Sequence, residues 1–236
     1  MLVAAAACPC PPLLVPDVAS GAAHEMDEAR AACLEAVGLL ADARPDRLVV
    51  VGPAEQDRRG THPQGTPGSF REFGVGLDVT LGTGPAPGQR RLPSSLAVAA
   101  WLLERAQWDA APVEGLGVGE PLRRARCAET GGELAQRTDR LALLVMGDGS
   151  ACRTLKAPGY FDERAADFDA AAARALGAAD SAALLALDER LGCELQASGR
   201  AGWQVLAGAG AGAGLSGRLL YDEAPYGVGY LVAAWS

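Results

Sequence analysis

The fold is decided by residues 141–150, which read LALLVMGDGS. Six apolar residues stand in a row from Leu141 to Met146. A run of this length that ends in glycine is typical of a strand buried on both faces of a parallel sheet. The GDGS segment that follows is rich in turn-forming residues. Together these features predict a central strand whose carboxyl end leads directly into a tight turn.

Strand and helix patterns alternate on both sides of this segment. Short apolar or alternating runs predict strands, and longer runs with apolar residues at helical spacing predict helices. The expected strands span residues 2–8, 48–51, 73–81, 113–118, 141–146, 219–221 and 228–234. The expected helices span residues 20–42, 94–106, 129–139, 162–176, 181–198 and 203–207. Such alternation predicts an α/β fold: a single domain, residues 1–236, with a mainly parallel central sheet and helices on both faces.

Two segments are expected to lie outside regular structure. Residues 54–69 are rich in Gly, Pro, Thr and Gln and predict a long loop. A loop of that length in a compact domain is usually functional or mobile. The Gly/Ala run at residues 208–214 predicts a flexible connection between two elements.

Composition limits the classes of protein to consider. The chain has 236 residues, of which 49% are hydrophobic and 21% charged, as expected for a globular domain with its own core. A net charge of −8 disfavours nucleic acid and anionic membranes as partners. The basic cluster at residues 123–126 is interpreted as a solvated surface. No run approaches the length of a membrane span, and residues 2–8 suit a buried strand better than a leader, so we expect a cytoplasmic protein. The sequence leaves a homo-oligomer open.

Six cysteines are scattered over the whole chain. A disulfide framework is a property of small secreted domains, so we expect free thiols in a reducing compartment. Cys8 and Cys10 form a C-x-C pair, but no second pair follows at the spacing of a structural zinc site.

Unusual residues follow three of the expected strands. The carboxyl ends of parallel strands meet at one edge of a sheet, which is where α/β proteins place their sites. We therefore expect these residues to gather at that edge, although each segment alone is explained as a turn. The candidates are Cys10, Glu55, Gln56, Asp148, Ser150 and Ala151.

The same segments resemble the catalytic-subunit superfamily of the class III extradiol ring-cleavage dioxygenases, to which Memo-like proteins are related, and most closely an actinobacterial branch of it. The resemblance is carried by CPCPPLLVP at residues 8–16, LLVMGDGS at 143–150, KAPGY at 156–160 and APYGVGY at 224–230. It runs nearly the full length of the chain. It implies Fe(II)-dependent oxygenative cleavage of catechols, with iron held by two His and one Glu and a further His as acid/base.

The residues at the matching positions differ from that pattern. Cys10 stands nearest to the first His ligand, and Glu55 or Gln56 stands at the second. Ala151 takes the place of the acid/base His, and Glu194, in a late helical segment, is the best match to the carboxylate ligand. The metal candidates are therefore Cys10, Glu55 and Glu194, and Fe(II) is implied by the resemblance alone.

Three interpretations remain open. The chain is an oxidoreductase of the extradiol dioxygenase type, or a pseudoenzyme that binds a partner or a small ligand, aromatic by resemblance, or an enzyme that uses Cys10, Asp148 or Ser150 in different chemistry. The two histidines offer little help, since His24 is expected on a helix surface and His62 in an exposed loop. The sequence identifies no catalytic residue.

Overall fold

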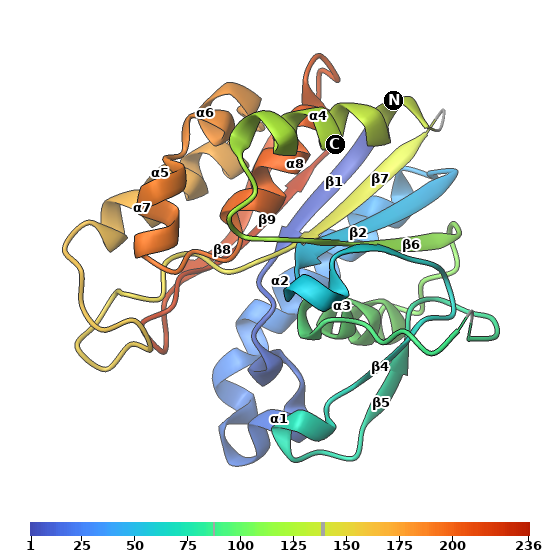
Figure 1. Ribbon diagram of the computed structural model, residues 1–236, viewed down its shortest axis with the longest axis horizontal. Coiled ribbons are helices and arrows are strands. Elements are labelled where there is room, and N and C mark those ends of the chain that lie inside the picture. The colour runs from blue at the N-terminus through green and yellow to red at the C-terminus, as the bar shows by residue number, and fades with distance from the viewer. Residues whose placement is uncertain (87, 138–139) are drawn as a thin grey trace.

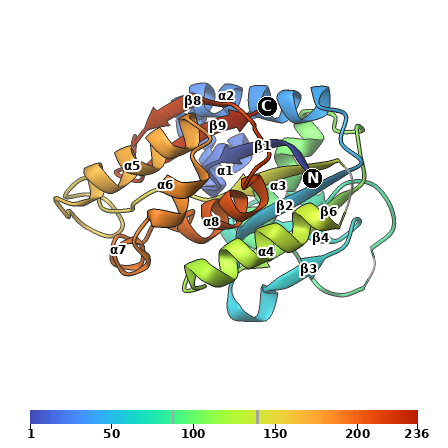
Figure 2. The same ribbon diagram turned by 90° about the horizontal axis from the view of Figure 1, so that it is seen from above.

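The structure is a computed structural model that describes residues 1–86, 88–137 and 140–236. The described residues form one central sheet of seven strands, covered by helices on both faces (Figures 1 and 2). The predicted α/β fold is therefore confirmed. In the same part of the chain, no helix is both long and apolar enough to cross a membrane.

The four central strands of the sheet are parallel. The order is β3 (Gly60–His62), β6 (Val113–Val118), β2 (Arg47–Pro53), β7 (Leu141–Met146), β1 (Leu2–Cys8), β9 (Tyr230–Trp235) and β8 (Gly217–Glu223). β3 and β9 flank the four parallel strands and run antiparallel to them, and the edge strand β8 pairs antiparallel with β9. The carboxyl ends of β6, β2, β7 and β1 consequently lie along one edge. Because β9 runs the other way, it begins at that same edge.

Small and branched side chains divide the core between the two faces of the sheet. Ala4, Ala6 and Leu144 belong to the cluster packed under α2 (Asp27–Asp42) and α3 (Ser94–Arg105). Ala5 and Leu143 belong to the cluster on the opposite face. Successive residues of a strand point to opposite faces, so one apolar run serves both clusters.

Several helices cover this second face. They are α4 (Arg124–Gln136), α5 (Ala165–Gly177), α6 (Ser181–Ala186) and α8 (Arg200–Gly210). The remaining helices are α1 (Pro16–Ala19) and α7 (Glu189–Glu194), and 3-10 turns span Pro12–Leu14, Ser20–Met26, Gln56–Arg58 and Arg71–Phe73.

Some element boundaries differ from those expected. The expected helix at 20–42 begins later, because a 3-10 turn spans Ser20–Met26 and α2 begins at Asp27. The expected loop at 54–69 contains β3 and also β4 (Pro67–Ser69), which pairs with β5 (Asp78–Thr80) in a separate two-stranded sheet. The expected strand at 73–81 is reduced to β5.

The late helical region also differs. The expected helix at 181–198 is divided because Asp188 Oδ1 accepts a hydrogen bond from Leu191 N at 2.7 Å and caps a new helix, α7. The glycines at the start of the 208–214 run continue α8 instead of forming a loop. They do so because α8 packs closely on α4: a Cβ at Gly208 would lie 2.2 Å from Ala128 O. The expected helix at 129–139 begins earlier, at Arg124, and its last two residues lie outside the described residues.

Candidate functional site

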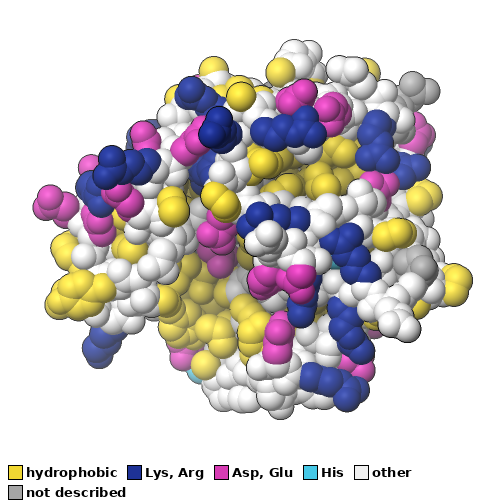
Figure 3. All heavy atoms as spheres, in the orientation of Figure 1, with side chains coloured by type: hydrophobic (Ala, Val, Ile, Leu, Met, Phe, Trp, Pro, Cys, Tyr) yellow, Lys and Arg dark blue, Asp and Glu magenta, His cyan; other side chains and the backbone are white. Residues whose placement is uncertain are grey.

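A cavity of about 490 Å³ lies where the four parallel strands end. Each strand contributes the residues that follow it: Cys10 after β1, Glu55 after β2, Glu120 after β6 and Asp148 after β7. Tyr230, the first residue of β9, completes the wall. Of the six residues expected to gather at this edge, Cys10, Glu55 and Asp148 line the cavity. Figure 3 shows the molecule in the orientation of Figure 1, with acidic and basic side chains near the centre of the view beside an apolar area.

Asp148 is held in place from two neighbouring loops. Its Oδ1 accepts a hydrogen bond from Cys10 N at 2.8 Å, and its own N–H donates to Ser198 Oγ at 3.0 Å. Burial raises the pKa of the Asp148 carboxyl to about 7; the negative charge of Glu120 acts in the same direction, and the Cys10 N–H opposes both. At neutral pH this carboxyl is therefore divided between its two protonation states. A carboxyl of this kind can accept or release a proton in a cavity.

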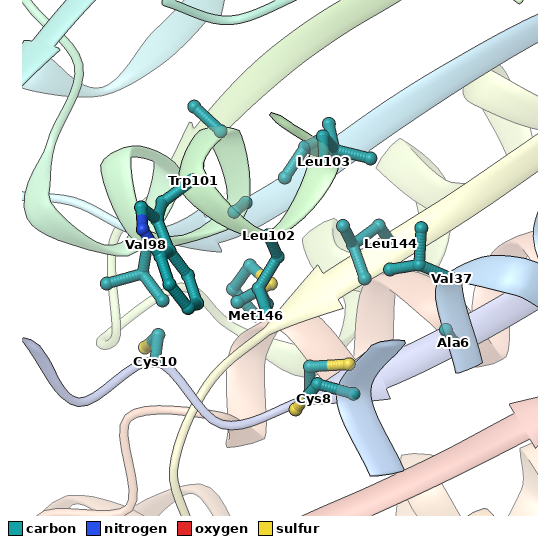
Figure 4. Close-up of a cluster of buried hydrophobic side chains, with 14 of the residues drawn as sticks. Ala6, Cys8, Cys10, Val37, Val98, Trp101, Leu102, Leu103, Leu144 and Met146 are labelled. Carbon is teal, nitrogen blue, oxygen red and sulfur yellow. The ribbon is translucent and has the colours of Figure 1, made fainter. Parts of the chain in front are cut away.

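Cys10 lines the cavity, but its side chain lies toward the core. Its side chain is directed toward Val98 of α3 and belongs to the hydrophobic cluster on that face (Figure 4). Burial raises the pKa of the Cys10 thiol well above its usual value, and the charges of Asp148 and Glu120 raise it further. The thiolate is the form that attacks electrophiles and binds metals. Cys10 is thus poorly suited to be a nucleophile or a ligand.

Charged side chains surround the mouth of the cavity. Glu55 and Glu120 are exposed, and neither carboxylate has an ion-pair or hydrogen-bond partner among the described residues. Arg59 lies across Gly119, and its Nε donates to Ala54 O at 3.3 Å. The mouth therefore carries two unpaired carboxylates and one guanidinium.

Tyr230 brings a hydroxyl group to the cavity wall. The residue is only 3% exposed, and its hydroxyl makes no hydrogen bond to any described residue. Burial raises the pKa of this phenol, and the nearby Asp148 and Cys10 raise it further. The hydroxyl keeps its proton at neutral pH and is free to donate to a molecule in the cavity.

The GDGS turn after β7 is locked by a buried carboxylate on α5. Asp169 is 1% exposed; its Oδ1 accepts from Ser150 N at 2.7 Å, and its Oδ2 accepts from Ser150 Oγ at 2.7 Å. Arg153 Nη1 donates to the same Oδ2 at 3.0 Å. The close approach requires glycine beside it, since a Cβ at Gly149 would lie 2.7 Å from Asp169 Oδ1. Ser150 is thus committed to structure and does not line the cavity.

The other candidates also lie outside the cavity lining. Gln56 is exposed on a 3-10 turn, and Ala151 is buried, with its N–H donating to Leu195 O at 2.9 Å. Glu194 lies on α7, where its carboxylate pairs with Arg164 at 2.9 Å and Arg190 at 2.8 Å. The hydrogen bond from Arg190, and after it the one from Arg164, lowers the pKa of Glu194. The Glu194 carboxylate is held by two surface arginines and does not line the cavity with Cys10 and Glu55.

The two histidines lie away from the cavity lining as well. His24 is exposed, as expected. The expectation of an exposed His62 is wrong: it is fully buried on β3, with Nε2 2.7 Å from Arg58 O. It is buried because the segment pairs with β6 instead of forming a free loop.

These residues do not fit the ferrous site that the resemblance implies. Among residues 1–86, 88–137 and 140–236, no three His, Cys, Asp or Glu side chains are grouped so that they could hold a metal ion. The thiol of Cys10 is protonated and turned into the core, and Ala151 has no group that moves a proton. Iron of this class requires imidazole and carboxylate ligands around open positions.

Sequence reasoning missed two residues of the site, Glu120 and Tyr230. Glu120 follows the strand at 113–118 by two positions, so the rule applied to the other three strand ends would have found it. The backbone around Glu120 is fixed by the buried Arg200, whose Nη1 donates to Leu122 O at 2.8 Å and whose Nη2 donates to Glu120 O. Tyr230 gave no such signal, because the direction of its strand could not be read from the sequence.

Comparison with solved structures gives a fold-level match. The chain is similar to JW3007, an uncharacterized protein of Escherichia coli K12, with a TM-score of 0.55 and 15% sequence identity. The match covers 99% of this chain and 100% of that one. At this identity the likeness supports a shared fold and nothing beyond it. No protein-family model and no curated protein matches the chain.

Proposed function

We propose that this chain is a class III extradiol dioxygenase-like protein that binds a small molecule in the strand-end cavity and does not cleave rings with iron. The observation that carries the proposal is the cavity of about 490 Å³ at the ends of four parallel strands. Ligands of α/β proteins bind at such edges, in cavities of this size. The segments that resemble the family, around Cys10 and Tyr230, form two of its walls.

The choice between the dioxygenase and the pseudoenzyme depends on the donor set. Ring cleavage needs an iron site with imidazole ligands, and the matching positions offer the buried thiol of Cys10 and the exposed carboxylate of Glu55 or amide of Gln56. The acid/base position holds the methyl group of Ala151, and the carboxylate of Glu194 is held by two arginines.

The pseudoenzyme interpretation needs a cavity with polar groups that lack partners. Glu55, Glu120 and Tyr230 supply them, since their side chains have no hydrogen-bond or ion-pair partner in the described part of the chain. An aromatic ligand, expected from the resemblance, would find one aromatic ring in the wall, that of Tyr230. The free cysteines support the expected cytoplasmic location.

Asp148 favours one second candidate, an enzyme that moves a proton without iron. A general acid or base works best when its pKa lies near the working pH, and that of Asp148 is about 7. This candidate predicts that a ligand of the cavity is slowly converted and that Asp148→Asn stops the conversion while binding continues.

Two measurements on the full chain test the proposal. Protein purified anaerobically with added Fe(II) is expected to carry no stoichiometric iron and to consume no oxygen with protocatechuate or catechol. A small-molecule screen by ligand-observed NMR is expected to find binders that are lost in Ser94→Trp, which fills the cavity from the first turn of α3. Ser216→Trp, an exposed position outside the cavity lining, is the matched control and keeps them. Stoichiometric iron with oxygen uptake, or no binder dependent on position 94, would overturn the proposal.

A further inference from the structure

Negative charge in and around the cavity exceeds positive charge. Asp148, Glu55 and Glu120 all line it, and Arg59 is the one basic side chain among the described lining residues. None of the three carboxylates forms an ion pair within the described part of the chain, although the protein forms many such pairs elsewhere. Unpaired like charges around one cavity raise its affinity for a cation.

A second observation, independent of charge, indicates that something binds there. Tyr230 is only 3% exposed, and its hydroxyl in the cavity wall has no hydrogen-bond partner among the described residues. The hydroxyl oxygen itself remains accessible, because it is not among the fully buried polar atoms that lack a partner in the described residues. The side chain is therefore almost wholly buried, while its hydroxyl remains accessible and keeps its hydrogen-bonding capacity for a molecule in the cavity.

The arrangement fits an organic cation better than a metal ion. The described residues contain no group of three Asp, Glu, His or Cys side chains close enough to share one ion. Their carboxylates are instead spread over a cavity with apolar walls, formed by Pro11, Pro12, Pro53, Pro121 and Val228. A cationic head with an apolar stem satisfies both the charge and the walls.

We infer that the cavity binds a protonated amine carried on an apolar stem, with Asp148, Glu55 and Glu120 as counter-charges and the Tyr230 hydroxyl as a hydrogen-bonding partner. The inference rests on the proposed function of the same cavity and names its ligand class. The ammonium donates to Asp148 and remains charged from pH 6 to pH 8, because an alkylamine resembles a lysine side chain.

Binding of a cation is linked to the protonation of Asp148. A positive charge beside the carboxyl favours its ionised form, so the complex releases a proton. The groups that face Asp148 are Cys10 after β1, Glu120 after β6 and Tyr230 at the start of β9. The thiol and the phenol stay neutral in this range because the pKa of each is raised. Affinity therefore rises from pH 6 to pH 8. At pH 7, where the carboxyl is half ionised, about half a proton is released per ligand.

The experiment compares probes of equal shape and different charge on the full chain. Hexylamine and benzylamine are titrated beside their neutral analogues, hexanol and benzyl alcohol, and their anionic analogues, hexanoate and benzoate. We expect the amines to bind at the Ser94-dependent site at least about tenfold more tightly than either analogue, with less advantage at high salt. Calorimetry at pH 7 in phosphate and in HEPES measures the released proton.

Variants separate the cavity carboxylates from the overall charge of the protein. The double variant Glu55→Gln/Glu120→Gln is expected to weaken amine binding about fivefold, as two exposed ion pairs would. Asp148→Asn keeps an oxygen to accept the Cys10 N–H, and it is expected to weaken binding about tenfold and to abolish proton release. The matched control Glu163→Gln/Glu223→Gln removes two exposed carboxylates outside the cavity lining and leaves binding unchanged.

The outcomes distinguish failure of the amine inference from failure of the proposed binding function. If neutral or anionic analogues bind at the Ser94-dependent site as tightly as the amines, the inference is wrong and the proposed binding function stands. If no probe of any charge binds there, both are overturned. Amine binding that persists in Asp148→Asn and in the double variant would also refute the assignment of the counter-charges.

Discussion

Replacing Asp169 by asparagine tests whether the buried carboxylate holds the GDGS turn, and with it Asp148, in place. The carboxylate accepts two hydrogen bonds from Ser150, both at 2.7 Å, and pairs with Arg153 at 3.0 Å. An asparagine of the same shape has one acceptor oxygen. Its NH₂ group would face either Ser150 or Arg153, both of which are donors at these contacts.

The magnitude follows from what the change leaves unpaired. Removing one partner of a buried ion pair costs about 3–5 kcal/mol, and an orphaned buried donor costs about 1–3 kcal/mol. Arg153 is 30% exposed and recovers some hydration, so the lower end of the first range applies. We expect Asp169→Asn to lower the free energy of unfolding by about 3 kcal/mol.

Urea unfolding followed by circular dichroism measures this difference. Asp167→Asn, an exposed position on the same helix without a side-chain partner, is the matched control and is expected to change stability by less than about 1 kcal/mol. A loss below about 1 kcal/mol for Asp169→Asn would show that the turn is held by its other hydrogen bonds. The contacts of Asp169 with Ser150 and Arg153 would then not be what positions Asp148.

Three more predictions concern the residues after the strand ends. The folded state holds a proton on Asp148 up to about pH 7, while the unfolded chain releases it near pH 4, so the free energy of unfolding falls as the pH rises between those values. Asp148→Asn is expected to lack that part of the pH dependence. Urea titrations that give the same pH profile for both proteins would contradict this prediction. Exposed Cys193 is expected to be alkylated long before Cys10 in the native protein, as peptide mass mapping over time would reveal; equal rates would mean that Cys10 is not the buried, protonated thiol described above. Ala151→His is expected to give no oxygen consumption with protocatechuate and Fe(II), because position 151 does not line the cavity; uptake of oxygen would relocate the site.

The centre of the sheet could be predicted because its strands are short, mostly apolar runs. The run at 141–146 and the alanine-rich run at 2–8 pair with each other along their whole length. β3 and β4 could not be predicted, because three-residue strands carry too few positions to show alternation. The extent of α8 depended on a contact with α4 that only the packed structure contains.

The site could be predicted where it depended on topology and could not where it depended on side-chain direction. Cys10, Glu55 and Asp148 follow parallel strands, and the topology alone brings them together. Whether a thiol turns into the cavity or into the core is decided by the apolar surface of α3, and Cys10 turns into the core. Glu194 was placed by likeness to a motif, and its arginine partners on the surface leave no role for it in the cavity.

Keeping the Asp148 carboxyl in this cavity lowers the stability of the empty protein. Burial and the charge of Glu120 hold the Asp148 carboxyl partly neutral at pH 7, which means that the fold opposes its ionisation. Exchanging the carboxyl for an amide would remove that opposition and keep the hydrogen bond from Cys10 N. Such a local conflict is expected at a functional site, where a bound molecule offsets it. A cation in the cavity provides such a state, because it stabilises the carboxylates that otherwise repel one another.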